Sequence, residues 1–113
     1  MNESKIDQLN REKASFKKQV TIAKAIRNLQ SNPDYQLVID QAFMVDECAR
    51  YARISGLVTR DDTERADALF KAQAAGHFAE WLSGQLKLGS MAEESLRGLE
   101  QIEHEILAES HKA

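Results

Sequence analysis

Residues 31–34 read Ser-Asn-Pro-Asp, and this stretch decides how the chain divides into helices. Asn32 is a preferred N-cap, because its side-chain oxygen accepts hydrogen bonds from free N–H groups of the first helical turn. Pro33 suits the first helical position, where no N–H is needed, and Asp34 places negative charge at the positive end of the helix dipole. The stretch predicts that one helix ends near residue 30 and another begins at residue 33.

The segment before this break has the apolar spacing of one long helix from Ser4 to Gln30. Its narrow apolar stripe is interrupted by Lys13. The stripe consists of Ile6, Leu9, Phe16, Val20, Ala23, Ile26 and Leu29. Such a helix is about 39 Å long, so part of it is expected to project and to pair with another helix, in the same chain or in a second molecule.

Two helices are predicted after the break, over residues 33–55 and 61–87. The first has a wide apolar arc, which is typical of a central helix with neighbours on more than one side, and Gly56 is expected to end it in the left-handed conformation. The second begins near Asp61, because Asp61 and Glu64 have the spacing of a capping box.

The helix over residues 61–87 has two apolar faces. One consists of Ala66, Phe70, Ala74, Phe78, Trp81 and Leu82, and the other of Ala68, Ala72, Ala75 and Ala79. Small residues allow close packing of helices, and the connection to the preceding helix is short. The two segments are therefore predicted to form a central antiparallel hairpin.

Gly89 and Ser90 are predicted to end this helix, because Ser90 and Glu93 form an S-x-x-E capping box for another. The new helix, residues 90–110, is acidic and carries Ala92, Leu96, Leu99, Ile102 and Ile106. The sequence thus predicts an all-α fold of about four helices in a single domain. Its parts are the N-terminal helix (1–31), the hairpin (32–88) and the C-terminal helix (90–110) of the chain 1–113.

Composition agrees with a helical protein that folds. Of 113 residues, 42% are hydrophobic, which argues against disorder, and the single proline and five glycines are too few for a turn-rich β protein. The single cysteine, Cys48, has no partner for an internal disulfide and is expected to be a small buried residue. No segment approaches the roughly 20 apolar residues of a membrane span, so no membrane partner is expected.

Charge is divided unevenly along the chain. Residues 1–31 carry seven basic and three acidic side chains, whereas the rest carry eight basic and fifteen acidic ones. The basic residues surround the first helix and are not interleaved with aromatic residues, which disfavours nucleic-acid binding. A basic first helix and an acidic last helix are instead expected to attract each other.

No group of residues has the pattern of a catalytic, cofactor-binding or metal site. His77 and Glu80 form H-x-x-E on one helix, but a di-metal bundle needs E-x-x-H on each of two helices. The sequence contains no nucleophile elbow, P-loop or glycine-rich dinucleotide turn. The chain is therefore predicted not to be an enzyme and to use no cofactor.

Two blocks of residues resemble a family of small tailed-bacteriophage proteins that have an "NPDF…I…F…EAARL" segment. The first block is Asn32-Pro33-Asp34-Tyr35, Val38-Ile39, Phe43, Ala49-Arg50 and Leu57; the second is Ala72, Ala75-Gly76, Phe78 and Trp81-Leu82. Glu47-Cys48-Ala49-Arg50 stands where the family has Glu-Ala-Ala-Arg. The resemblance covers about residues 20–86 and implies a component of the phage particle or an assembly factor, without enzymatic activity.

The hypothesis from sequence is a bacteriophage virion or assembly protein that acts through helix-mediated contacts, in the virion or in the host cytoplasm during assembly. Its expected partners are further copies of itself, larger virion proteins, or both. The alternative is a small phage regulatory protein that binds a host protein or nucleic acid. The residues predicted to form the interaction surface are Phe16, Val20, Leu96, Leu99 and Ile106.

Overall fold

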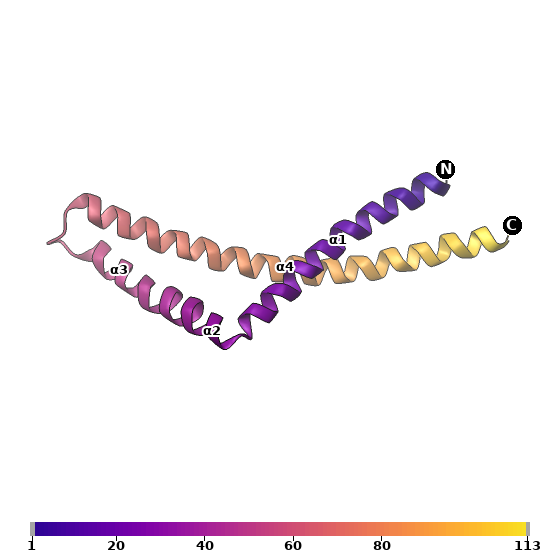
Figure 1. Ribbon diagram of the computed structural model, residues 1–113. Helices are drawn as coiled ribbons and strands as arrows, with labels where there is room; N and C mark the ends of the chain where they lie inside the picture. Colours follow the sequence, from indigo (N-terminus) through magenta and orange to yellow (C-terminus); the bar gives the residue numbers. More distant parts are fainter. Residues whose placement is uncertain (1, 113) are drawn as a thin grey trace. The chain divides into compact units, whose positions relative to one another are not determined.

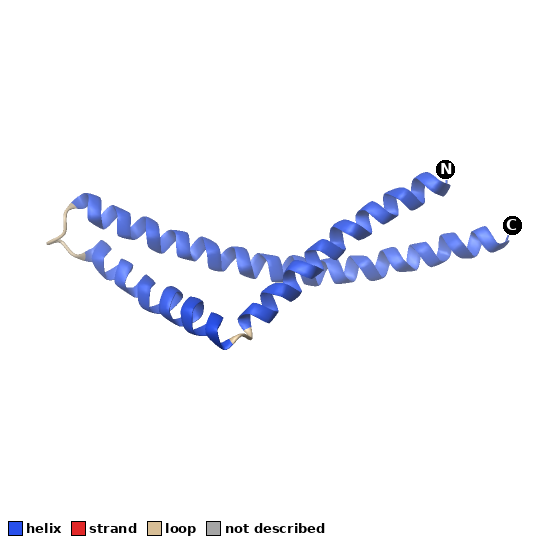
Figure 2. Cartoon of the chain, viewed as in Figure 1, coloured by secondary structure: helices blue, strands red, loops and turns tan. Residues whose placement is uncertain are grey.

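A computed structural model describes residues 2–112, all of whose regular structure is helical (Figures 1 and 2). The elements are α1 (Asn2–Gln30), α2 (Pro33–Tyr35), η1 (Gln36–Glu47), α3 (Cys48–Gly56) and α4 (Asp62–Lys112). Because α2, η1 and α3 follow one another without a loop, the described chain has three continuous helical segments. The predicted all-α class is confirmed, but the predicted number of about four helices is wrong.

The predicted break at Gly89 and Ser90 does not exist, and the predicted helix 90–110 is the second half of α4. Gly89 is buried inside the helix, where a β-carbon added to it would collide with the β-carbon of Ala23 in α1. The same atom would lie 3.7 Å from the α-carbon of Ala23. This glycine therefore permits two helices to approach closely and does not end one.

The chain divides into two compact units. Unit 1 comprises Met1–Ile26 and Gly84–Ala113, and unit 2 comprises Arg27–Ser83. The boundaries of the two units fall inside α1 and α4.

Unit 1 is an antiparallel pair formed by α1 and the second half of α4 (Figure 1). In each helix, one series of less exposed residues recurs at alternating intervals of three and four. They are Ile6, Leu9, Lys13, Phe16, Val20 and Ala23 in α1, and Gly89, Ala92, Leu96, Leu99, Glu103 and Ile106 in α4. This is the spacing of a two-stranded coiled coil. The long N-terminal helix therefore pairs within its own chain.

A charged pair lies in the apolar seam of unit 1. The Nζ of Lys13 is 2.6 Å from Oε2 of Glu103, and the two side chains are 16% and 37% exposed. The hydrogen bond from Lys13, with its positive charge, holds the pKa of Glu103 below the ordinary value of 4.5. A single charged residue in such a seam specifies which residues pair across it. Lys13, which interrupts the apolar stripe, thus fixes the register of α1 on α4.

Replacing Glu103 by glutamine is expected to destabilise the protein at neutral pH but not in acid. The ion pair contributes fully above pH 4.5 and is lost as the pH falls through the lower pKa of the folded protein. Urea unfolding of the wild type and of Glu103→Gln across this range measures the difference. Glu109→Gln, at an exposed position of the same helix, is the control. A difference that persists at low pH contradicts the ion pair.

Unit 2 contains the predicted N-cap at Asn32, which is confirmed. The Oδ1 atom of Asn32 accepts hydrogen bonds from the backbone N–H groups of Asp34, at 2.8 Å, and Tyr35, at 3.2 Å. The start of α4 is built in the same way, since Oδ1 of Asp61 accepts from the N–H of Glu64 at 2.7 Å. Both caps join atoms two or three residues apart, and local sequence therefore suffices to form them.

Asn32 and Ser90 were both predicted to start a helix, and alanine substitutions at the two positions are now expected to have different effects on stability. Asn32→Ala should lower the free energy of unfolding by about 1 kcal/mol, because two N–H groups lose their acceptor. Ser90→Ala should change it by less than about 0.5 kcal/mol, since Ser90 is exposed in the middle of α4. Urea unfolding of both variants distinguishes them, and a large loss in Ser90→Ala would restore the predicted helix start.

Between its caps, unit 2 contains a π-helix over Gln36–Glu47. The N–H of Cys48 donates to the carbonyl of Phe43, the i→i−5 pattern of this structure. Four residues at intervals of four along this part of the chain are half-buried, namely Tyr35, Ile39, Phe43 and Glu47.

The hairpin turn differs from its prediction. Leu57, with φ −82° and ψ 109°, ends α3, and its N–H donates to the carbonyl of Ile54 at 3.1 Å. No glycine within residues 2–112 has a positive φ, so the left-handed ending predicted at Gly56 is wrong. Nε of Arg65 in α4 donates to the free carbonyl of Ser55 at 3.1 Å, so a neighbouring helix satisfies the end of α3.

Candidate functional site

The first half of α4 packs on the rest of unit 2 with its alanine face. Ala68 and Ala75 are buried, with 4% and 2% of their surface exposed, and Ala72 between them is half-buried. Unit 2 consists only of described residues, and these two alanines are its only buried residues. The close approach that small residues allow has therefore decided which side of α4 faces inward.

The other apolar face of α4 is left uncovered. Phe70 is 65% exposed, Phe78 39% and Trp81 52%. These residues and Ala74 recur at helical spacing, and Ala75 lies about 140° around the helix from Phe70, at 100° per residue. One neighbouring helix cannot cover both sides. We define Phe70, Ala74, Phe78 and Trp81 as the aromatic face of α4.

The segment 33–55 was expected to be a central helix, and this expectation is wrong. Three of its apolar residues, Leu37, Val38 and Val45, are more than half exposed. Contacts on one side of the segment leave the rest of its wide apolar arc in contact with water. Unit 2 consequently has apolar surface on both of its helical segments and no large buried side chain.

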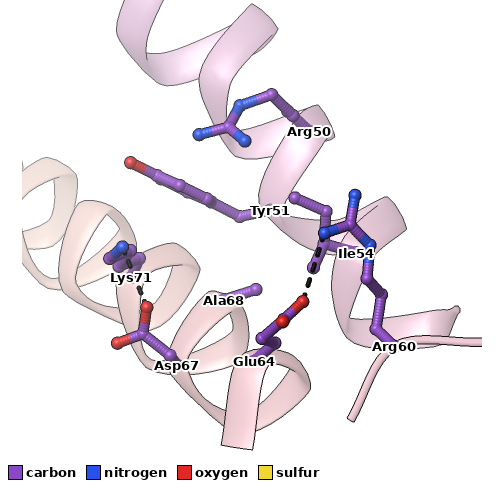
Figure 3. A pocket seen from close by; sticks show the side chains of 8 residues that line it. All are labelled: Arg50, Tyr51, Ile54, Arg60, Glu64, Asp67, Ala68 and Lys71. Carbon is purple, nitrogen blue, oxygen red and sulfur yellow. Dashed lines mark hydrogen bonds and ion pairs between the residues drawn. The ribbon is translucent and has the colours of Figure 1, made fainter.

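A shallow pocket of about 160 Å³ lies between α3 and the start of α4 (Figure 3). The ring of Tyr51 stands between two cations. The guanidinium carbon of Arg50 is 5.2 Å from the ring centroid, and Nζ of Lys71 is 5.9 Å from it. The pocket thus joins side chains of two helices around one aromatic ring, with Ala68 at its floor.

Every cation that lines this pocket has an acidic partner. Arg50 binds Glu47, Arg60 binds Glu64 at 3.1 Å, and Lys71 binds Asp67 at 2.9 Å. The hydrogen bond from Arg50 lowers the pKa of Glu47, and the hydrogen bond to Asp67 raises the pKa of Lys71. Both shifts keep the groups charged and paired. These ion pairs join residues three or four apart, and the contact of Lys71 with Tyr51 is the one that crosses between the two helices. The cluster offers neither a general base nor an unpaired positive charge for an anion.

The residues considered for metal or thiol chemistry do not converge. His77 and Glu80 are both exposed on α4, and His104 is exposed as well. Among the residues that the structure describes, no three His, Cys, Asp or Glu side chains gather closely enough to hold a metal ion. Cys48 is half-buried and is less enclosed than expected.

The predicted interaction residues lie in the seam of unit 1, where all five are half-buried. They are Phe16, Val20, Leu96, Leu99 and Ile106. Ile106 lines a cavity of about 70 Å³ together with Ile6 and Leu9 of the opposite helix. The structure thus brings the two predicted stripes together, and each covers part of the other.

Sequence reasoning missed the aromatic face of α4 as a possible binding surface. The signal for it was present, because residues 61–87 carry two apolar faces and only one neighbouring helix was predicted for them. That one of the two faces would stay uncovered was therefore predictable, and the inward packing of the alanine face decided which one.

Along residues 2–112, no helix combines the length and the apolar character that crossing a membrane requires. Comparison of the chain with protein-family models, with curated proteins and with solved structures found no match in any of the three.

Proposed function

We propose that this chain is a non-enzymatic protein that acts through helix faces, as a bacteriophage virion component or assembly factor. The observation that carries the proposal is the aromatic face of α4, in a unit whose only buried residues are two alanines. The assignment to a phage is supported by the resemblance of residues 20–86 to small tailed-phage proteins.

The aromatic face is large enough to bind a partner. An aromatic side chain presents roughly 150–250 Å² of surface, so three that are about half exposed leave about 300 Å² in contact with water. This area is at the lower end of the range for the largest apolar patch on a monomeric protein, about 300–600 Å², and such a patch is often functional. A structural role also requires no reactive group, in agreement with the charge-balanced cluster around Tyr51.

The regulatory alternative has less support. Its main feature was the basic N-terminal segment, but in unit 1 this segment lies along an acidic one. The α1 part carries six basic and three acidic residues, and the α4 part carries three basic and six acidic. The unit is therefore neutral in formal charge, which weakens the attraction for nucleic acid.

The proposal is tested in particles from a host that carries the gene. Mass spectrometry of purified particles and assembly intermediates should detect the chain, and sequencing should place its gene beside virion genes. Phe70→Ser should reduce its incorporation, whereas Val58→Ser, at an 83% exposed position in the hairpin turn, should not. Absence from both particles and intermediates would overturn the phage role, and equal incorporation of the two variants would exclude the aromatic face.

A further inference from the structure

We infer that the aromatic face of α4 binds the same face of a second copy, in an antiparallel arrangement with a two-fold axis beside Ala74. The inference rests on the proposed function, in that it takes this face to be a binding surface, and it names the partner. It follows from the order of residues on the face and from a hollow beside them.

The face is self-complementary about Ala74. Phe70 and Phe78 lie four positions before and after it, so a two-fold axis at Ala74 places Phe70 of one copy opposite Phe78 of the other. The alanine of each copy faces the other at the axis, where a small residue lets the helices approach. In a two-fold interface each contact occurs twice, so the two rings form two equivalent aromatic pairs.

The same axis seats Trp81 in a hollow on the partner. A shallow pocket on α4 is lined by Asp62, Thr63, Ala66, Asp67 and Phe70. Four of these, at positions 63, 66, 67 and 70, have the spacing of the four residues that receive one side chain in knobs-into-holes packing. Trp81 lies seven positions after Ala74, and Asp67 seven before it. The two-fold axis therefore brings the largest side chain of the face over its hollow.

The polar groups match as well. An indole N–H needs an acceptor when its ring is covered, and the carboxylate of Asp67 lies at the rim of this hollow, 2.9 Å from Nζ of Lys71. An unrelated partner would have to supply both a protruding ring and a recess at this separation. A second copy of this chain already carries both, as Trp81 and the hollow beside Asp67.

The contact is small, so the dimer is expected to be reversible. Thr63 to Trp81 span about 27 Å of helix at 1.5 Å per residue, which corresponds to the low end of specific interfaces, below about 1,200 Å² in total. The monomer–dimer equilibrium should therefore depend on protein concentration.

The test is sedimentation equilibrium of the full chain over a range of concentrations, together with its fluorescence. The chain has a single tryptophan, Trp81, so dimerisation should shift the emission to shorter wavelength as concentration rises. Trp81→Ala should dimerise at least about 30-fold more weakly, as expected when a buried interface tryptophan is truncated. Val58→Ala is the control, with dimerisation unchanged.

A second pair of variants keeps the test decisive if Trp81→Ala fails to fold. In a Cys48→Ser background, Ala74→Cys should be joined into a covalent dimer by a short bismaleimide, and Ala79→Cys, on the other side of α4, should not. A chain that stays monomeric, or equal cross-linking at both positions, would overturn the two-fold pairing. If Phe70→Ser nevertheless reduces incorporation into particles, the proposed function stands and only the identity of the partner is wrong.

Discussion

Gly89→Ala is expected to destabilise the protein by roughly 1–3 kcal/mol, the range for overpacking a close contact. In an exposed helix the same change stabilises by about 1 kcal/mol, because alanine is the better helix former. At this position the added β-carbon meets the backbone and β-carbon of Ala23, which is fully buried, and it lies 3.6 Å from the carbonyl oxygen of Gln19. None of these atoms is the end of a flexible side chain, so the helices must separate.

Gly98→Ala is the matched control for this variant. Gly98 lies in the same helix and the same unit, but an added β-carbon there meets nothing within 4 Å. Helix propensity alone should then stabilise the protein by about 1 kcal/mol. Urea unfolding followed by circular dichroism measures both free energies. The two glycine-to-alanine changes should have opposite signs, and a stabilising Gly89→Ala would mean that α1 and α4 are not in contact at Gly89.

Leu9→Ala is expected to cost about 2–5 kcal/mol, the range for truncating a buried leucine. Leu9 is 6% exposed, and Leu9 and Ile26 are the two large side chains among the buried residues that the structure describes in unit 1. It packs in the seam beside Ile6 and Ile106. The cavity left by its truncation lies between two helices that have few other buried contacts, which makes this one of the most sensitive positions of the chain.

Leu88→Ala provides the comparison, because Leu88 lies in the same unit but is 40% exposed. Its truncation removes less buried surface, so the loss should be below about 1 kcal/mol. Both variants should be followed by urea and by thermal unfolding. Similar losses in the two variants would contradict the burial of Leu9 in the seam between α1 and α4.

The variants Gly89→Ala, Leu9→Ala and Glu103→Gln examine different features of the same helix pair. Gly89 sets how closely the helices approach, Leu9 contributes apolar burial, and the pair between Lys13 and Glu103 sets the register. Only the last should depend on pH in the acidic range. Measuring all three separates the distance, the burial and the alignment of α1 on α4.

The sequence by itself determined the helix starts at Asn32 and Asp61, and that nearly all of the chain is helical. The caps at Asn32 and Asp61 join atoms two or three residues apart, so no distant neighbour is needed to form them. The alternating stripe of α1 likewise showed that this helix needs a partner. These features depend on local hydrogen bonds and on the helical repeat, both of which the order of residues contains.

Tertiary structure decided which helical residues contact another helix and which remain exposed. Glycine inside a helical pattern signals either an end or a close contact, and only the presence of Ala23 beside Gly89 selects the second. Likewise α4 has two apolar faces, and the packing of its alanines inward is what leaves Phe70 and Trp81 exposed. In each case the deciding atoms come from a distant part of the chain, so periodicity along the helix could not distinguish the alternatives.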